Sequence, residues 1–321
     1  MTLDELVEDY IAHRFLRPAS QKSYRQRVRT ITARCGSVGV DEVNIETVRS
    51  YFKALIKDGN SQATWTSNRR HFLTLWRYAM DLGVTTSNPW RSIPPGNSMR
   101  QPKPISEEHL KLAFNSIGLR PDKYRPHLFW RTMILIFSLT AIRRSQLVGL
   151  LWRDINMEDK VPHLRCRRET SKTHREYPVP LCEVGTRVLM QFRQTSKTLW
   201  GDTPQFLASQ VFNFELHRNS KTSDLVSLTP DHVSLFFKRL SDDLGILISP
   251  HRIRHRTATQ LARLMHPKEL QEFMGHTQYS TTAMYLWPPL EEQTVAVNKL
   301  VALDLEKNIF VNMPWEIKLK D

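Results

Sequence analysis

The sequence predicts a mainly α-helical protein with a small β-hairpin or sheet, divided into two domains. Three observations predict this. The chain has 321 residues, which is enough for two domains that each bury a core. Apolar residues recur at the helical period along most of the chain. One short central interval instead alternates as strands do, and a proline-rich stretch separates two helical regions.

Residues 1–90 are expected to form a domain of four helices. Thr2 and Glu5 have the spacing of a capping box at the start of the first helix. Three further helices are expected near residues 20–35, 44–57 and 61–82, and glycines follow the second and the fourth. The expected inward-facing residues, in chain order, are Leu3, Leu6, Val7, Tyr10, Ile11, Tyr24, Val28, Ile31, Cys35, Ile45, Val48, Phe52, Leu55, Trp65, Phe72, Leu75, Trp76 and Ala79.

Residues 91–104 are expected to be a basic interdomain linker, because prolines and a glycine disfavour regular structure there. A second, mainly helical domain is expected at 105–289, beginning with Ser106 as an N-cap. A C-terminal helix and tail are expected at 290–321. The helices expected in the second domain are 106–116, 127–140, 144–151, 183–196, 230–244, 253–265, 268–275 and 280–286.

A hairpin is expected between these helices. Its strands are His163–Arg167 and Glu176–Val179, which alternate or are extended. The turn between them contains Lys172.

The charge of the chain indicates a polyanionic partner. The formal net charge is +14 and the sequence pI is about 9.9. Single-sign clusters on the second and fourth helices and in the linker are candidate phosphate contacts, although such a helix face can equally be a solvated surface. The candidate DNA-binding residues are Lys22, Arg25, Arg29, Arg69, Arg70, Arg100 and Lys103.

Several classes of protein are disfavoured. No apolar run approaches the ~20 residues of a membrane span, and the acidic start is unlike a signal peptide, so we expect a cytoplasmic, nucleoid-associated protein. The three scattered cysteines indicate reduced thiols and not a disulfide framework. Metal-site and Walker-type spacings are missing from the sequence, so no metal and no cofactor is expected.

Four short motifs carry the chemistry. They are Thr140–Leu147 around Arg143, Thr170–Leu181 around Lys172, His251–His255 with its His-x-x-Arg pattern, and Leu270–Tyr285. The last contains Gly275-His276 and ends in a tyrosine. Together, in this order and spacing, they resemble the tyrosine recombinases, also called the phage integrase family.

The resemblance covers residues 2–288 and implies a fold. The first domain is similar to the family's SAM-like core-binding helical bundle, and the second to its mixed α/β catalytic domain. It implies a site-specific DNA recombinase that acts in integration, excision, inversion or resolution. It also implies a 3′-phosphotyrosyl intermediate, a free 5′-hydroxyl and strand exchange through a Holliday junction.

The residues themselves fit phosphodiester chemistry. Two guanidinium groups, Arg143 and Arg254, suit the non-bridging oxygens, whose negative charge grows in the transition state. His251 would donate a further hydrogen bond or help move a proton. His276 would act as a donor or as an orienting partner.

Tyr285 is the expected nucleophile, with Tyr279 as a weaker rival. Lys172 is the expected general acid for the departing 5′ oxygen, although it could also be a plain turn lysine with His174 or Arg175 nearby. His255 is expected to pack or to touch phosphate without doing chemistry.

The sequence departs from the family pattern at two positions of the first motif. Ala141 stands where glycine is usual, and Gln146 where an acid is usual. Gln146 is still expected to hydrogen-bond at Arg143. Two alternatives stay open: a catalytically weakened DNA-binding relative, and a type IB topoisomerase-like strand transferase.

The expected partner is a double-stranded DNA core site, bound by two protomers and assembled into a homotetramer. An accessory DNA-bending or directionality factor is a further expected partner. In the family a C-terminal helix often packs on a neighbouring protomer, so residues 290–321 are expected to be exchanged between protomers.

Overall fold

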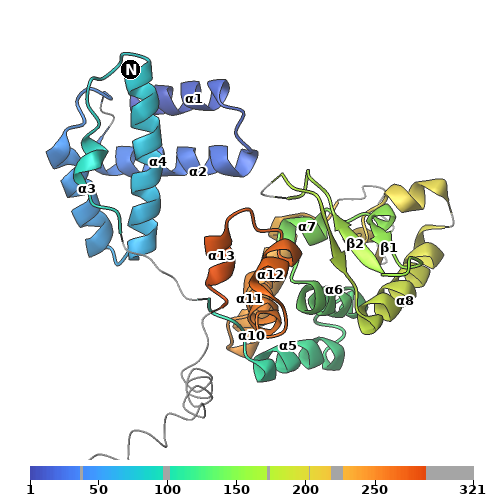
Figure 1. Cartoon of the computed structure of the whole chain (residues 1–321). Helices are drawn as coiled ribbons and strands as arrows, with labels where there is room; N and C mark the ends of the chain where they lie inside the picture. The colour runs from blue at the N-terminus through green and yellow to red at the C-terminus, as the bar shows by residue number, and fades with distance from the viewer. Residues whose placement is uncertain (37–38, 97–101, 172–173, 202, 218–226, 287–321) are drawn as a thin grey trace, which may run out of the picture. The chain divides into compact units, whose positions relative to one another are not determined.

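The computed structural model describes residues 1–36, 39–96, 102–171, 174–201, 203–217 and 227–286 (Figure 1). The chain forms two compact units, Met1–Arg100 and Gln101–Asp321, each with its own apolar core. The first unit therefore takes in part of the segment 91–104 that the sequence suggested as a linker. The C-terminal helix and tail expected at 290–321 lie outside the described residues.

The first unit contains the four predicted helices and one short 3-10 helix. The capping box at Thr2 is present: its Oγ1 accepts from the Glu5 N–H at 3.2 Å, and a Glu5 carboxylate oxygen accepts from the Thr2 N–H at 2.8 Å. Gly36 directly follows the second helix, and Gly83 lies two residues beyond the end of the fourth. Both glycines have positive φ. The elements are α1 (Leu3–His13), α2 (Pro18–Cys35), α3 (Ile45–Lys57), α4 (Gln62–Asp81) and η1 (Pro89–Ser92).

The core of this unit follows the predicted helical stripes with one correction. Ile45 was expected inside but is 45% exposed, because it begins α3, and the buried face starts one turn later. Tyr51 is buried in its place, and its hydroxyl donates to the Asn68 amide oxygen at 3.1 Å. Trp90 of η1 completes this core, stacked on Phe72 with ring centroids 4.1 Å apart.

The second unit is mainly helical, as predicted. Several helix boundaries differ from expectation by a few residues. For example, α7 ends before Gly149, and α11 begins at Pro250, where Ser249 Oγ accepts from the Arg252 N–H at 3.3 Å. The helices are α5 (Glu107–Leu119), α6 (His127–Thr140), α7 (Arg144–Val148), η2 (Trp152–Asp154), α8 (Glu183–Trp200), η3 (Pro204–Ala208), α9 (Phe214–His217), α10 (Pro230–Leu244), α11 (Pro250–Leu261), α12 (Pro267–Phe273) and α13 (Tyr279–Ala283).

The predicted hairpin is part of a three-stranded antiparallel sheet in the order β1-β2-β3. Its strands are β1 (Ile155–Asn156), β2 (His163–Cys166) and β3 (Tyr177–Pro180), with Cys166 opposite Tyr177. The sequence did not predict β1, because a two-residue strand is too short to show alternation. Residues 172 and 173 in the turn lie outside the described residues.

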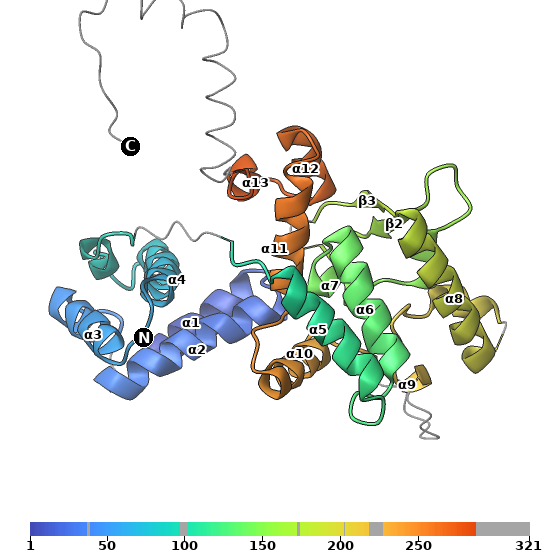
Figure 2. The ribbon, with the colours of Figure 1, turned by 90° about the horizontal axis from the view of Figure 1, so that it is seen from below.

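Helix α6 lies at the centre of the second unit and packs against α5, α8 and α11 (Figures 1 and 2). It ends at Thr140 and is followed by Ala141, which has a left-handed backbone (φ +50°) and turns the chain toward α7. Ala141 also belongs to a small apolar cluster with residues of α11 and α12 and with Tyr285. This packing brings four separated segments together: the α6–α7 turn, α11, the end of α12, and the residue that follows α13.

Candidate active site

Helix α11 supplies three polar side chains to the site. His251 and His255 lie one turn apart on the same face of the helix, with ring centroids 4.0 Å apart. Arg254, between them in sequence, points into the unit and is only 4% exposed. The His-x-x-Arg-His run therefore divides into an imidazole pair and a buried guanidinium.

Arg254 is held by three hydrogen-bond acceptors. It donates to the carbonyl oxygen of Ala141, to that of Met274 at 2.9 Å, and to Nε2 of His276 at 3.0 Å. Burial and then the charge of Arg143 lower the pKa of Arg254 to about 10, so the group remains a cation at neutral pH. Arg254 is thus a charged donor whose orientation is fixed by the turn after α6 and by the end of α12.

The turn before His276 requires a glycine. Gly275 has φ +60°, and a Cβ there would lie 2.3 Å from the ring of Tyr177. The Tyr177 hydroxyl lies 2.9 Å from Nε2 of Gln146, and Oε1 of Gln146 accepts from the Arg143 backbone N–H at 2.8 Å. The predicted hydrogen bond between Gln146 and Arg143 is therefore confirmed, at the backbone and not at the guanidinium.

Arg143 precedes α7 and is half-buried. Its Nη1 is buried and has no hydrogen-bond partner among the described residues. Its charge is close enough to lower the pKa of His251, Arg254, His276 and Tyr285. A buried donor without a partner is costly, and an anionic oxygen of a substrate would satisfy it.

His276 is buried and neutral. A guanidinium can only donate, so Nε2 of His276 accepts from Arg254, and Nδ1 carries the proton toward Thr282 Oγ1, 2.9 Å away. Burial, then the charges of Arg254 and Arg143, lower the pKa of His276 to about 3. Of the two roles expected for His276, this geometry favours the orienting partner.

The Tyr285 side chain lies against the imidazoles of His255 and His276. Its side chain is 7% exposed, its hydroxyl lies 2.8 Å from Nδ1 of His255, and its ring is nearly parallel to that of His276 at 6.3 Å. Burial raises the pKa of the phenol, whereas the charges of Arg254 and Arg143 lower it. Tyr279, the rival candidate, is 52% exposed.

Five of the six expected site residues therefore converge: Arg143, His251, Arg254, His276 and Tyr285. Lys172, the sixth, lies outside the described residues. The contact of His255 with Tyr285 was not predicted from the sequence. Its spacing from His251 was the available signal, because residues i and i+4 share a helix face.

The candidate DNA-binding side chains differ in their surroundings. Lys22, Arg29, Arg70 and Lys103 are exposed, and Arg100 lies outside the described residues. Helix α2 contains no acidic residue, but α1 supplies one to it: Arg25 forms two 2.7 Å hydrogen bonds with Glu8. Nε of Arg69 donates to the carbonyl oxygen of Ile93, so both of these arginines also have contacts within the unit.

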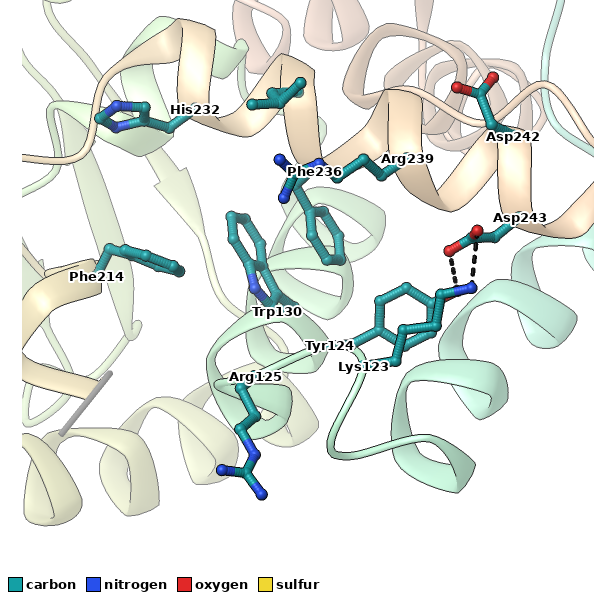
Figure 3. Close-up of a pocket in the computed structure, with 11 residues that line it drawn as sticks. Lys123, Tyr124, Arg125, Trp130, Phe214, His232, Phe236, Arg239, Asp242 and Asp243 are labelled. Atoms are coloured by element: carbon teal, nitrogen blue, oxygen red, sulfur yellow. Dashed lines mark hydrogen bonds and ion pairs between the residues drawn. The ribbon is translucent and has the colours of Figure 1, made fainter. Parts of the chain in front are cut away.

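A pocket of about 670 Å³ lies elsewhere in the second unit (Figure 3). The stacked rings of Trp130 and Phe236, 3.7 Å apart, and the ion pair of Lys123 with Asp243 at 2.8 Å form part of its wall. No candidate site residue lines it. In the described part of the chain, no three His, Cys, Asp or Glu side chains are grouped to hold a metal ion, and no helix is long and apolar enough to cross a membrane.

Comparisons with known proteins find similarity along most of the chain. The sequence model of the phage integrase family matches residues 114–288. A protein from Pseudomonas aeruginosa named putative tyrosine recombinase XerC is 28% identical over 307 residues, which cover 89% of this chain and 69% of that protein. A protein of the same name from Pseudomonas syringae is 27% identical, and the match covers 64% of its length. The chain thus spans about two-thirds of these relatives.

Solved structures show the same fold. The Tn1549 transposon integrase, in complex with transposon right-end DNA, has a TM-score of 0.68 at 20% identity and covers 94% of this chain and 100% of its own. A lambda integrase tetramer bound to a Holliday junction has a TM-score of 0.66 at 16% identity, covering 89% of this chain and 77% of its own.

Proposed function

The chain belongs to the phage integrase family and is a tyrosine recombinase, and we propose that it cleaves and rejoins DNA strands through an ester between Tyr285 and a 3′ phosphate. The observation that carries this proposal is the convergence of a buried phenol with two guanidinium groups and three imidazoles. We assign core-site binding to residues 1–90, a connecting role to 91–104 and catalysis to 105–289.

In this proposal the scissile phosphate lies between the two arginines. Arg143 Nη1 supplies a donor that the protein leaves unpaired among the described residues, and Arg254 supplies a second cation that its neighbours hold in place. Both stabilise the charge that develops on the non-bridging oxygens. His251, exposed at the start of α11, donates a further hydrogen bond to the same group.

The chemical step exchanges one phosphate ester for another. The Tyr285 oxygen bonds to phosphorus as the bond from phosphorus to the 5′ oxygen breaks, and Lys172 gives a proton to the departing oxygen. The number of ester bonds is unchanged, so the reverse attack by a 5′-hydroxyl reseals the strand. No metal ion and no cofactor takes part in this scheme.

We also propose the assembly. Two protomers bind each duplex core site, and four act as a homotetramer around a Holliday junction, as the lambda integrase tetramer does. Residues 290–321 would pack on a neighbouring protomer, and an accessory DNA-bending or directionality factor would set the outcome. The reaction would take place in the cytoplasm, at the nucleoid.

Covalent capture tests the proposal with no assumption about the sequence of the DNA site. The substrate is a pool of nicked duplexes of random sequence. After cleavage, the short fragment that carries the new 5′-hydroxyl diffuses away at the nick. The protein–DNA ester therefore accumulates on the sequences that the protein selects. The full chain should form this adduct in the presence of a chelator, and Tyr285→Phe should bind the selected duplex without forming it. Equal adduct yields from Tyr285→Phe and the unmodified protein would refute the assignment.

Three assays separate the proposal from its two alternatives. A weakened DNA-binding relative would bind the pool and form no adduct. A type IB topoisomerase-like enzyme would relax supercoiled plasmid quickly, at limiting protein and without regard to sequence. The proposed recombinase should instead exchange strands between two copies of its selected duplex.

A further inference from the structure

His255 is the group in contact with the attacking atom. Its Nδ1 lies 2.8 Å from the hydroxyl oxygen of Tyr285, within the range for direct proton transfer. We propose that His255 is a catalytic residue that accepts the proton of Tyr285 as the phenol oxygen attacks the phosphate. This inference rests on the proposed function and adds to it the identity of the base.

The neighbouring groups are less suited to this role. His276 has its Nε2 occupied by the Arg254 guanidinium and its Nδ1 proton directed at Thr282, so neither nitrogen has a lone pair for the phenol. His251 contacts the ring of His255, one turn further along α11. Among the described residues, no carboxylate forms a hydrogen bond with the Tyr285 hydroxyl.

The surroundings keep His255 ready to accept. Burial, then the nearby charges of His251, Arg254 and Arg252, hold its pKa at about 4, so its imidazole is neutral and carries one lone pair at neutral pH. Such a weak base cannot deprotonate the resting phenol. An anionic phosphate at the site offsets these cations and raises the basicity of the ring. Bond formation to phosphorus meanwhile makes the phenol proton strongly acidic.

The step balances in both directions. In cleavage, the Tyr285 oxygen–phosphorus bond forms, the phenol proton moves to Nδ1 of His255, and the 5′ oxygen leaves with a proton from the general acid on the opposite side. In rejoining, the 5′-hydroxyl attacks and gives its proton to that group. The protonated His255 then returns its proton to the departing tyrosine oxygen.

Two substitutions at His255 separate chemistry from packing. His255→Asn keeps a hydrogen-bonding group near the position of Nδ1 but provides no base, and His255→Ala removes both. Each should slow single-turnover adduct formation by ~100-fold or more on the selected nicked duplex. Both should retain DNA affinity. His109→Asn, an exposed histidine on α5, is the matched control and should react at the unmodified rate.

Modified reactants then show whether His255 acts on the nucleophile or on the leaving group. Fluorotyrosine at position 285 has a more acidic phenol and depends less on a base, so it should recover much of the rate lost in His255→Ala. A duplex with a bridging 5′ sulfur has a leaving group that needs no proton. It should not rescue His255→Ala, although it should rescue a variant that lacks the general acid.

The outcomes are distinguishable. If the unmodified protein forms no adduct at all, the proposed function fails and the role of His255 with it. If it forms the adduct and both His255 variants react at the same rate, only the role of His255 is overturned. Rescue of His255→Ala by the sulfur substrate and not by fluorotyrosine would also overturn it, because His255 would then serve the leaving group.

Discussion

Nη2 of Arg254 donates a hydrogen bond to Nε2 of His276 over 3.0 Å. Because Nδ1 of His276 lies 2.9 Å from Thr282 Oγ1, the imidazole joins the guanidinium to α13. The Tyr285 backbone N–H in turn donates to the Thr282 carbonyl oxygen at 2.9 Å. One neutral ring thereby links Arg254, the cation proposed to bind phosphate, to the segment that carries Tyr285, the proposed nucleophile.

The first prediction concerns this link. His276→Ala should slow adduct formation by ~10²–10³-fold, the loss typical of a misplaced oxyanion donor, with DNA affinity unchanged. His276→Gln should lose much less, because its amide oxygen can accept from Arg254. Single-turnover rates on a captured duplex measure both. Equal losses in the two variants would contradict an orienting role and favour proton transfer by His276.

The second prediction concerns Arg143. Arg143→Ala should lower the cleavage rate by at least ~10²-fold, because it removes the buried Nη1 that we propose as a donor to the phosphate. Arg143→Lys should recover little of this loss, since an ammonium cannot reproduce the planar pair of donors. A lysine variant with a nearly normal rate would show that charge alone suffices and would remove the geometric argument.

The sequence predicted which side chains lie together where the motifs are short and helical. His251 and Arg254 were placed at a helix start, and Tyr285 was preferred over Tyr279, because the motif spacing is short and local. The contact of His255 with Tyr285 was not predicted, since it joins two residues that are 30 positions apart in the chain. The buried position of Tyr51 in place of Ile45 likewise depends on tertiary packing, which periodicity does not determine.

The third prediction concerns Ala141, which replaces the family's usual glycine. Its φ of +50° costs an alanine about 1 kcal/mol, but its fully buried methyl group stabilises the fold by about 0.8 kcal/mol. Ala141→Gly should therefore change the free energy of unfolding by less than ~1 kcal/mol, measured by urea denaturation. Ala141→Val should lose ~1–3 kcal/mol, because a branched side chain is strained there and overpacks the cluster.

The fourth prediction concerns α2. Lys22 and Arg29 are seven residues apart, so they lie on the same side of the helix, and both are exposed. If they bind phosphates, the double variant Lys22→Ala/Arg29→Ala should reduce the slope of log affinity against log salt by about 2. Arg34→Ala is the control, because Arg34 is paired with Asp58. Equal slopes for the double variant and the unmodified protein would exclude this helix face from the DNA interface.

The fifth prediction concerns stability in mild acid. Burial lowers the pKa of His217 to about 4, and its ring stacks on Phe192 at 4.7 Å. In the unfolded chain the pKa is near 6.5, so between about pH 6.5 and 4 the unfolded state binds more protons. The stability that the neutral ring contributes is therefore present above pH 6.5 and is lost as the pH falls.

This loss can be assigned to His217 by substitution. From pH 7 to pH 5 the unmodified protein should lose on the order of 1 kcal/mol or more of unfolding free energy through buried histidines with lowered pKa values, such as His217. His217→Phe keeps an aromatic ring against Phe192 but cannot titrate, so its urea midpoint should fall less over the same interval. Carboxylates with lowered pKa values, such as Glu107, lose their contribution only below about pH 4.5 and do not obscure the comparison. Identical acid sensitivity in the two proteins would mean that His217 is solvated, and protonated without cost, in the folded state.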